Sequence, residues 1–357
     1  MISQPTQATA SDGTASRAVG LPPLLGQALG PLVPGAPIPP GPRMNPWDRA
    51  GARPVTTLPD GVKALLEGLW LSPGYHRGPD GKTTRIRQRP VPSAGGAYPV
   101  HTHLVISSLG AAGLDPGLYA YDHEHDTLLR RHDERPAGRR PGAPESADSW
   151  MVFTVQPGRS FGRYRHRAWP LWIADAAYAL TAAEFLLDDP AETLIGPAAG
   201  LRDLLAFAPG ADTGWWLSRG LVPEMPLVAI RLPRRIRVNR PRSTALARRR
   251  SPSLATFATG EPGAASSRTL HLAQRSGQAW LLGADRIEAW TVSPQDPPRQ
   301  IARAVWNAHR CAARLVYDAA ESDRWRCRPV SGFAATGQSW VIHALALLDA
   351  GDEESAP

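Results

Sequence analysis

Cysteine is scarce in this sequence: Cys311 and Cys327 are the only two among 357 residues. Small secreted domains that depend on disulfides use many more, so two thiols exclude a disulfide scaffold. A protein with so few cysteines is typical of a reducing compartment. We therefore expect a cytoplasmic protein.

Long apolar runs are also missing. No stretch reaches the roughly 20 apolar residues that a membrane helix needs, so we expect no membrane segment. Residues 1–46 are rich in Pro, Gly, Ala and Ser and lack a basic start followed by an apolar core, which favours a disordered leader over a signal peptide. With 42% hydrophobic residues, the chain can bury one large core or two modest ones.

Lysine is nearly absent as well, with only Lys63 and Lys82, so arginine carries the net charge of +8. Nine arginines fall between Arg231 and Arg250, and a stretch rich in Ser, Ala, Gly and Pro follows. We interpret residues 234–267 as an Arg-rich linker. Its basic face could attract nucleic acid or an acidic peptide through long-range electrostatics, but we favour a solvated linker and expect no nucleic-acid partner.

The most informative stretch is a run of small residues that leads into a strand expected over residues 100–107. Such a loop lets the backbone approach a flat or phosphorylated ligand, because its residues carry no bulky side chains and a serine hydroxyl can donate a hydrogen bond. Arg89, just upstream, can form a bidentate pair with phosphate. An ordinary turn before a strand is the alternative. The members of the run are Pro92, Ser93, Ala94, Gly95 and Gly96.

Hydrophobic periodicity predicts several helices. Apolar residues spaced three and four apart indicate helices over residues 62–69, 169–187, 301–320 and 339–350. Asp60 is a candidate N-cap of the first helix. Small residues dominate the second helix, so we expect it to pack closely against another helix.

Two motifs resemble one enzyme family. The run R-x-x-P-S-A-G-G-A-Y-P-V at residues 89–100 is followed by P-G-L-Y-A-Y-D at residues 116–122. Together they resemble the first half of the nitroreductase-like flavin dehydrogenases of the SagB/ThcOx type, which oxidise azolines to azoles in ribosomally made peptides. The resemblance covers residues 60–233. It implies an α+β fold in which an antiparallel sheet flanked by helices binds FMN, generally at a two-fold interface.

The resemblance also assigns FMN-binding residues to both halves of the chain. In the first half these are Arg89 and the loop of small residues. In the second half, the helix at 301–320 keeps a histidine that is usual in the family's helix, and the run R-P-V-S-G-F resembles the loop that follows it. The residues expected to bind FMN are Arg89, Pro92, Ser93, Ala94, Gly95, Gly96, His309, Pro329, Val330, Ser331 and Gly332.

These similarities suggest a degenerate internal duplication. We expect a nitroreductase-like domain at 47–233, the linker at 234–267 and a degenerate second nitroreductase-like half at 268–357. The alternative is that two alanine-rich amphipathic helices look alike without a common origin. Because the second half is short and has no equivalent of the small-residue loop, we expect a homodimer, while a pseudo-dimer within one chain stays open.

Arg163 and Tyr164 are the candidate catalytic residues. In the azoline dehydrogenases a Lys-Tyr pair at the corresponding place is tied to proton removal, and Arg163–Tyr164 matches it in part. Arginine stays protonated, so Tyr164 is the candidate base. We expect nearby Arg165 and Arg167, with Arg163, to lower its pKa. A packed tyrosine in a basic surface turn is the alternative.

Histidines also allow a metal site to be considered. His101 and His103 lie on one face of the expected strand, and D-H-E-H-D at 122–126 offers further ligands. The resemblance places a hairpin turn with solvated polar residues at 122–126, so we expect no metal. Packing roles are expected for His343, Trp215, Trp216 and Trp340.

The sequence therefore predicts an FMN-dependent dehydrogenase that oxidises thiazoline or oxazoline rings in a ribosomally made peptide, with a cyclodehydratase as a candidate partner. Two alternatives stay open. One is a flavin-dependent reductase, for example of dehydroamino acids, which the missing lysine supports. The other is a flavin-free scaffold that binds a peptide or a partner enzyme.

Overall fold

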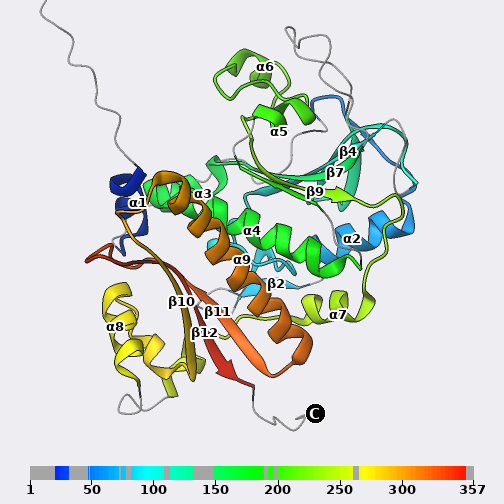
Figure 1. Ribbon diagram of the computed structural model, residues 1–357. Coiled ribbons are helices and arrows are strands. Elements are labelled where there is room, and N and C mark those ends of the chain that lie inside the picture. The colour runs from blue at the N-terminus through cyan, green and yellow to red at the C-terminus, as the bar shows by residue number, and fades with distance from the viewer. Residues whose placement is uncertain are drawn as a thin grey trace, which may run out of the picture.

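Two large antiparallel sheets, separated by two long helices, form the body of the protein in a computed structural model (Figure 1). The helices are α4 (Ala168–Leu186) and α9 (Pro298–Ser322), which pack against each other and confirm the helices expected at 169–187 and 301–320. The structure describes residues 21–31, 47, 49–71, 74–77, 82–107, 113–131, 148–188, 192–196, 199–259 and 265–350.

The larger sheet has seven strands in the order β1-β6-β5-β4-β7-β9-β8. One face packs against α4, and the other lies under the short helices α5 (Ala199–Leu204) and α6 (Thr213–Leu217) (Figure 1). The strand expected at 100–107 is confirmed as β4. The strands are β1 (Arg53–Pro54), β4 (Val100–Ile106), β5 (Gly117–Asp122), β6 (Thr127–Arg130), β7 (Ser149–Val155), β8 (Thr193–Ile195) and β9 (Met225–Leu232).

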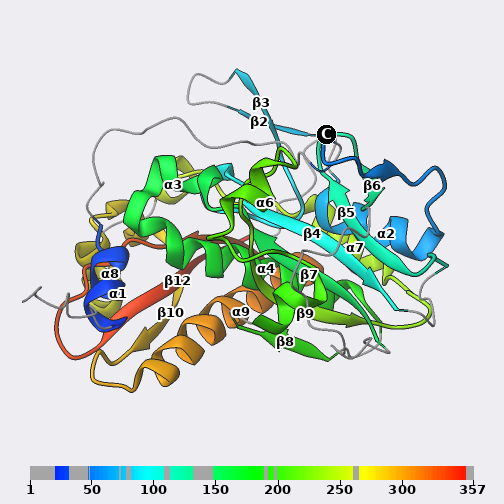
Figure 2. The same cartoon turned by 90° about the horizontal axis from the view of Figure 1, so that it is seen from above.

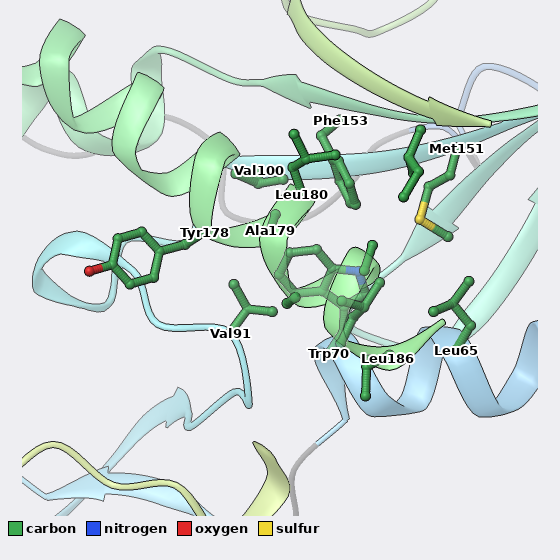
Figure 3. Close-up of a cluster of buried hydrophobic side chains, with 14 of the residues drawn as sticks. Leu65, Trp70, Val91, Val100, Met151, Phe153, Tyr178, Ala179, Leu180 and Leu186 are labelled. Atoms are coloured by element: carbon green, nitrogen blue, oxygen red, sulfur yellow. The ribbon is translucent and has the colours of Figure 1, made fainter. Parts of the chain in front are cut away.

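The main core lies between this sheet, α4 and α2 (Asp60–Trp70) (Figure 3). Trp70, Phe153 and Leu180 meet there from the three elements. Because α4 presents mostly alanines, the same core continues across it to Ala312 and Ala313 of α9. The expected helix at 62–69 is confirmed as α2, but it already begins at Asp60, so Pro59 and not Asp60 stands at the cap position.

The smaller sheet has the order β10-β12-β11, formed by β10 (Arg286–Val292), β11 (Trp325–Val330) and β12 (Trp340–Asp349). The helix expected at 339–350 is wrong, because this segment is β12. Side chains of β12 alternate between two cores: Leu345 and Leu347 join the one shared with α9, whereas Ala344 and Ala346 face α8 (Ser267–Ser276). A strand buried on both faces is apolar throughout, which periodicity does not distinguish from a buried helix.

The N-terminal segment departs from the disordered leader expected over residues 1–46. Residues Leu21–Leu29 form helix α1, whose Leu25 and Leu29 pack into an apolar cluster with Ile301 and Val305 of α9. The leader prediction is therefore wrong for residues 21–31. Residues 1–20 and 32–46 lie outside the described part of the chain.

The stretch expected as an Arg-rich linker also contains a helix, α7 (Arg240–Arg248). The Asn239 side chain accepts a hydrogen bond from the Arg242 backbone N–H (3.1 Å) and caps the helix, as asparagine commonly does. Ala245 and Leu246 are buried where α7 meets α2, α4 and α9. The arginines of this stretch therefore lie within and around a packed helix, which corrects the picture of a solvated linker for these residues.

A two-stranded hairpin of β2 (Tyr75–Arg77) and β3 (Thr83–Arg87) stands apart from both large layers (Figure 2). Its last strand leads directly into the loop of small residues. Among the residues described, no helix has the length and apolar character to cross a membrane.

Candidate functional site

The loop of small residues ends in a short 3-10 turn, η2 (Ala94–Gly96). Gly95 and Gly96 have φ values of +59° and +65°, which side chains disfavour, so glycine is the residue that fits this turn. Ser93 stabilises the loop, because its Oγ accepts a hydrogen bond from the Tyr98 backbone N–H (2.9 Å). Pro92 precedes it and is half-buried.

The candidate catalytic pair lies directly against this loop. Arg163 and Tyr164 end helix α3 (Gly158–Tyr164). A Cβ atom at Gly95 would collide with the Tyr164 hydroxyl and lie 3.0 Å from Arg163 Nη1. Arg163 Nη1 also donates to the Gly95 carbonyl oxygen (3.4 Å). The fold therefore brings together the loop and the pair, which are about 70 residues apart in sequence.

The expected low pKa of Tyr164 is wrong. Burial raises the pKa of this phenol, and it outweighs the opposing effects of Arg163 and Arg167. Asp175 raises it further. Tyr164 therefore keeps its proton at neutral pH and is a hydrogen-bond donor.

Asp175 of α4 is a site residue that sequence reasoning missed. Its carboxylate is buried, 5% exposed, and it accepts hydrogen bonds from the Ala94 backbone N–H (3.1 Å) and the Ser93 hydroxyl (3.2 Å). Burial raises the pKa of Asp175 to about 7, although these two bonds lower it. The sequence pattern that could have identified Asp175 is a single carboxylate among the alanines and other apolar residues around it in α4.

Arg89 is buried next to Tyr98 and His123. It is 9% exposed, contacts His123 Nδ1, and its guanidinium lies 4.9 Å from the centre of the Tyr98 ring. Among the described residues no carboxylate forms an ion pair with it. A buried guanidinium without a carboxylate favours an anionic ligand, because a buried cation is costly unless it is paired.

In the second half, His309 is buried where α9 faces β12. Its ring centre lies 4.6 Å from that of His343, and neither ring nitrogen of His309 has a hydrogen-bond partner among the described residues. Tyr178 of α4 contacts His343 Nε2 through its hydroxyl (3.2 Å). His343 has a packing position, as expected, but on a strand.

The segment expected as a loop around Pro329 to Gly332 is a strand up to Val330, because Pro329 and Val330 pair with β12. The loop begins at Ser331, whose carbonyl accepts from Gln278 Nε2 (2.9 Å). Gly332 (φ +88°) approaches the first half, since a Cβ there would lie 2.7 Å from Arg167 Nη2. The second half of the chain therefore approaches Arg167, close to Tyr164 in sequence, through Gly332. Pro329 and Val330 are instead paired with β12.

The histidines considered as metal ligands bind a carboxylate instead. His101 Nδ1 and His103 Nε2 donate to buried Glu224 at 3.0 and 2.9 Å, and Trp47 Nε1 donates at 3.2 Å. The turn at 122–126 joins β5 to β6 as a hairpin, as expected, but Asp122 and His123 are buried and not solvated. No group of three or more His, Cys, Asp and Glu residues in the described chain is arranged to hold a metal ion.

Trp215 and Trp216 pack with Phe207.

The residues at this site fit a flavin. The loop Ser93–Gly96 offers backbone and little side chain, and Tyr164 and Arg163 face it. Buried His309 has two ring nitrogens without partners among the described residues, but its printed contact is with His343 and not with this loop. Arg89 is the buried cation that a phosphate would need.

No protein-family model matches the sequence, and no curated protein matches it. A solved structure from Anabaena variabilis, assigned as a nitroreductase, is 12% identical over 91% of this chain and 98% of its own, with a TM-score of 0.54. A chain of the Escherichia coli microcin synthetase complex McbBCD with truncated pro-MccB17 is 14% identical over 65% and 77%, with a TM-score of 0.29. A protein from Ralstonia eutropha, also assigned as a nitroreductase, is 18% identical over 61% and 92%, with a TM-score of 0.28.

The Anabaena structure shows that this chain has a nitroreductase-like α+β fold, as the sequence predicted. At 12% identity the likeness concerns the fold alone.

Proposed function

We propose that this protein is an FMN-dependent oxidoreductase that dehydrogenates thiazoline or oxazoline rings of a ribosomally made peptide to azoles. The observation that carries the proposal is the direct contact between the Ser93–Gly96 loop and the Arg163–Tyr164 pair. It joins the two features of the sequence that resemble the azoline dehydrogenases, and it does so at one place in a nitroreductase-like fold.

The residues proposed to hold FMN divide into three groups. Arg89, beside His123, is proposed to pair with the phosphate. The backbone of Pro92–Gly96 would carry the flat ring system. His309, Pro329, Val330, Ser331 and Gly332 are proposed to contribute from the second half.

Azoline oxidation removes hydride from one ring carbon and a proton from its neighbour, and FMN, when bound, supplies the hydride acceptor. The protein must therefore orient the ring, keep water away and take the proton. Half-buried Tyr164 keeps its proton and can donate a hydrogen bond to the ring or to an adjacent carbonyl of the peptide. Arg163 is exposed and can bind the peptide backbone.

One observation favours a reductase as the second candidate. Because the pKa of Tyr164 is raised, its hydroxyl is a proton donor at neutral pH, as reduction of a dehydroamino acid requires.

A flavin-free scaffold is the third candidate. A peptide substrate, a cyclodehydratase partner and a cytoplasmic location are part of the proposal.

The assembly is proposed to be a homodimer, and light scattering would test this. A monomer with full flavin occupancy would instead support a pseudo-dimer. In that arrangement α4 and α9 of one chain would take the place of two symmetry-related helices from the two subunits of a dimer.

The function itself is tested with purified, FMN-loaded protein and a synthetic peptide that carries one thiazoline. Dehydrogenation lowers the peptide's mass by two hydrogens and produces the thiazole. Reduction of a dehydroalanine peptide in place of this reaction would support the second candidate.

A further inference from the structure

A row of exposed arginines lies on and around helix α7 and has no role in the scheme above. The helix packs against α2, α4 and α9 through buried Ala245 and Leu246 (Figure 1). Arg240, Thr244 and Arg248 are exposed, and their spacing of four residues places them on one outer face of the helix. More exposed arginines flank the helix at both ends. We call this set the arginine ridge, and its members are Arg234, Arg235, Arg237, Arg240, Arg248 and Arg250.

The described chain does not neutralise the charge of the arginine ridge. None of its members forms an ion pair with a described carboxylate. Arg242 is different, because it turns towards α4 and α9, where it pairs with Glu321 (3.3 Å) and donates to the Phe185 carbonyl oxygen (3.4 Å). Exposed charges of one sign attract a partner of the opposite sign over about 10 Å at moderate salt. The ridge therefore suits a partner that carries several negative charges.

One end of the arginine ridge lies at the candidate functional site. Arg249, at the C-cap of α7, donates from Nε and Nη2 to the Pro90 carbonyl oxygen, both at 3.1 Å. Pro90 comes just before the small-residue loop. Burial, and after it the charge of Arg250, lowers the pKa of His76, whose Nε2 lies 2.9 Å from the Tyr98 hydroxyl that follows this loop. A molecule bound along the ridge therefore reaches the loop that is proposed to hold FMN.

We propose that the arginine ridge docks an acidic segment of the peptide substrate and directs the attached chain to the site; this inference rests on the proposed function. Arg240 and Arg248 are eight residues apart on α7, which is about 12 Å along a helix axis and about four residues of an extended peptide. A short segment with Asp or Glu three to four residues apart can therefore contact both arginines at once. These contacts hold the substrate and include no covalent step.

The composition of this stretch favours a peptide over a nucleic acid. Residues 231–250 contain no aromatic side chain on which a base could stack. Proteins that bind single strands combine a basic groove with such aromatic side chains. A guanidinium binds a carboxylate well, because its planar N–H groups can pair with both carboxylate oxygens.

The test measures binding to the purified full-length protein and needs no turnover. The probes are two fluorescently labelled thiazoline peptides that differ in one segment, which carries Glu in the first peptide and Gln at the same positions in the second. The variant is Arg240→Glu/Arg248→Glu. The matched control is Arg299→Glu/Arg303→Glu, because these two arginines are also exposed on one helix, at the start of α9, whereas α7 contacts Glu321 near its end.

We expect the wild type and the control variant to bind the acidic peptide equally, and roughly tenfold more tightly than Arg240→Glu/Arg248→Glu does, because two attractions become repulsions. Salt raised from about 50 to about 500 mM should weaken wild-type binding and reduce this difference. The Gln peptide should bind all three proteins with the same low affinity. Should the charge reversal prevent folding, Arg240→Gln/Arg248→Gln decides, and it should weaken acidic-peptide binding by a smaller factor.

Equal affinity of the acidic peptide for the wild type and the ridge variants would overturn the inference and leave the proposed function standing. A single-stranded oligonucleotide that binds more tightly than the acidic peptide, with the same loss in the ridge variants, would also overturn it, by assigning the ridge to nucleic acid. The flavin content of the same protein is measured in parallel. Acidic-peptide binding through the ridge by a protein that takes up no FMN would overturn the proposed function and support the docking surface.

Discussion

The hydroxyl of Tyr164 occupies the space into which a side chain at Gly95 would extend. Gly95→Ala should therefore displace either the loop or Tyr164, in addition to the roughly 1 kcal/mol that alanine costs at a positive φ. We expect the variant to fold with a lowered melting temperature and to lose most of its FMN. Thermal unfolding and the flavin-to-protein ratio measure the two effects.

Gly337→Ala is the matched control for this change. Gly337 has a similar φ of +71°, but a Cβ there meets nothing within 4 Å. It should lose a comparable amount of stability and keep its FMN. Equal flavin loss in both variants would mean that the backbone strain, and not the contact with Tyr164, is responsible.

Arg89 tests the phosphate site. Arg89→Ala should weaken FMN binding by on the order of 2 kcal/mol, about thirtyfold, because a charge-assisted bond to phosphate is lost. Fluorescence titration with FMN measures the dissociation constant, and riboflavin, which lacks the phosphate, should bind both proteins alike. A variant that keeps stoichiometric FMN would remove Arg89 from the site.

Tyr164 and Arg163 test the resemblance at the level of single residues. Tyr164→Phe should keep FMN, because the ring stays in place, and should slow the reaction through the loss of a hydrogen-bond donor. Arg163→Lys restores the pair of the azoline dehydrogenases, so we expect more thiazole from the thiazoline peptide. Unchanged rates in both variants would move the chemistry away from this segment.

Asp175 also makes the stability of the flavin-free protein depend on pH. Because the folded state raises its pKa from 3.8 to about 7, its stabilising contribution is complete below about pH 4 and is lost as the pH rises through 7. Asp175→Asn should therefore gain unfolding free energy relative to the wild type across this window, by up to on the order of 4 kcal/mol. Urea unfolding of both proteins at several pH values measures the difference, and a constant difference at every pH would contradict the raised pKa.

Local patterns in the sequence predicted much of the fold. The β4 strand and helices α2, α4 and α9 follow from their spacing of apolar residues. Strand β12 did not, since its two buried faces hide the alternation that defines a strand. Helix α1 was missed because its pairing with Ile301 and Val305 is about 275 residues away in sequence and leaves no local trace.

For the site, sequence motifs predicted the loop and the Tyr164 segment, and the fold brings these together. The electrostatics were not predictable from neighbours in sequence. Three arginines beside Tyr164 suggested a lowered pKa, but burial, which only the packed structure determines, has the larger and opposite effect. Asp175 was missed for the same reason, because its partners Ser93 and Ala94 lie some 80 residues away.

The absorption spectrum of the purified protein tests the central claim most directly. The account predicts a yellow protein that carries oxidised flavin, identified as FMN after release and present in roughly stoichiometric amount. A colourless protein that also fails to take up added FMN would contradict it, and would leave the flavin-free scaffold as the remaining candidate.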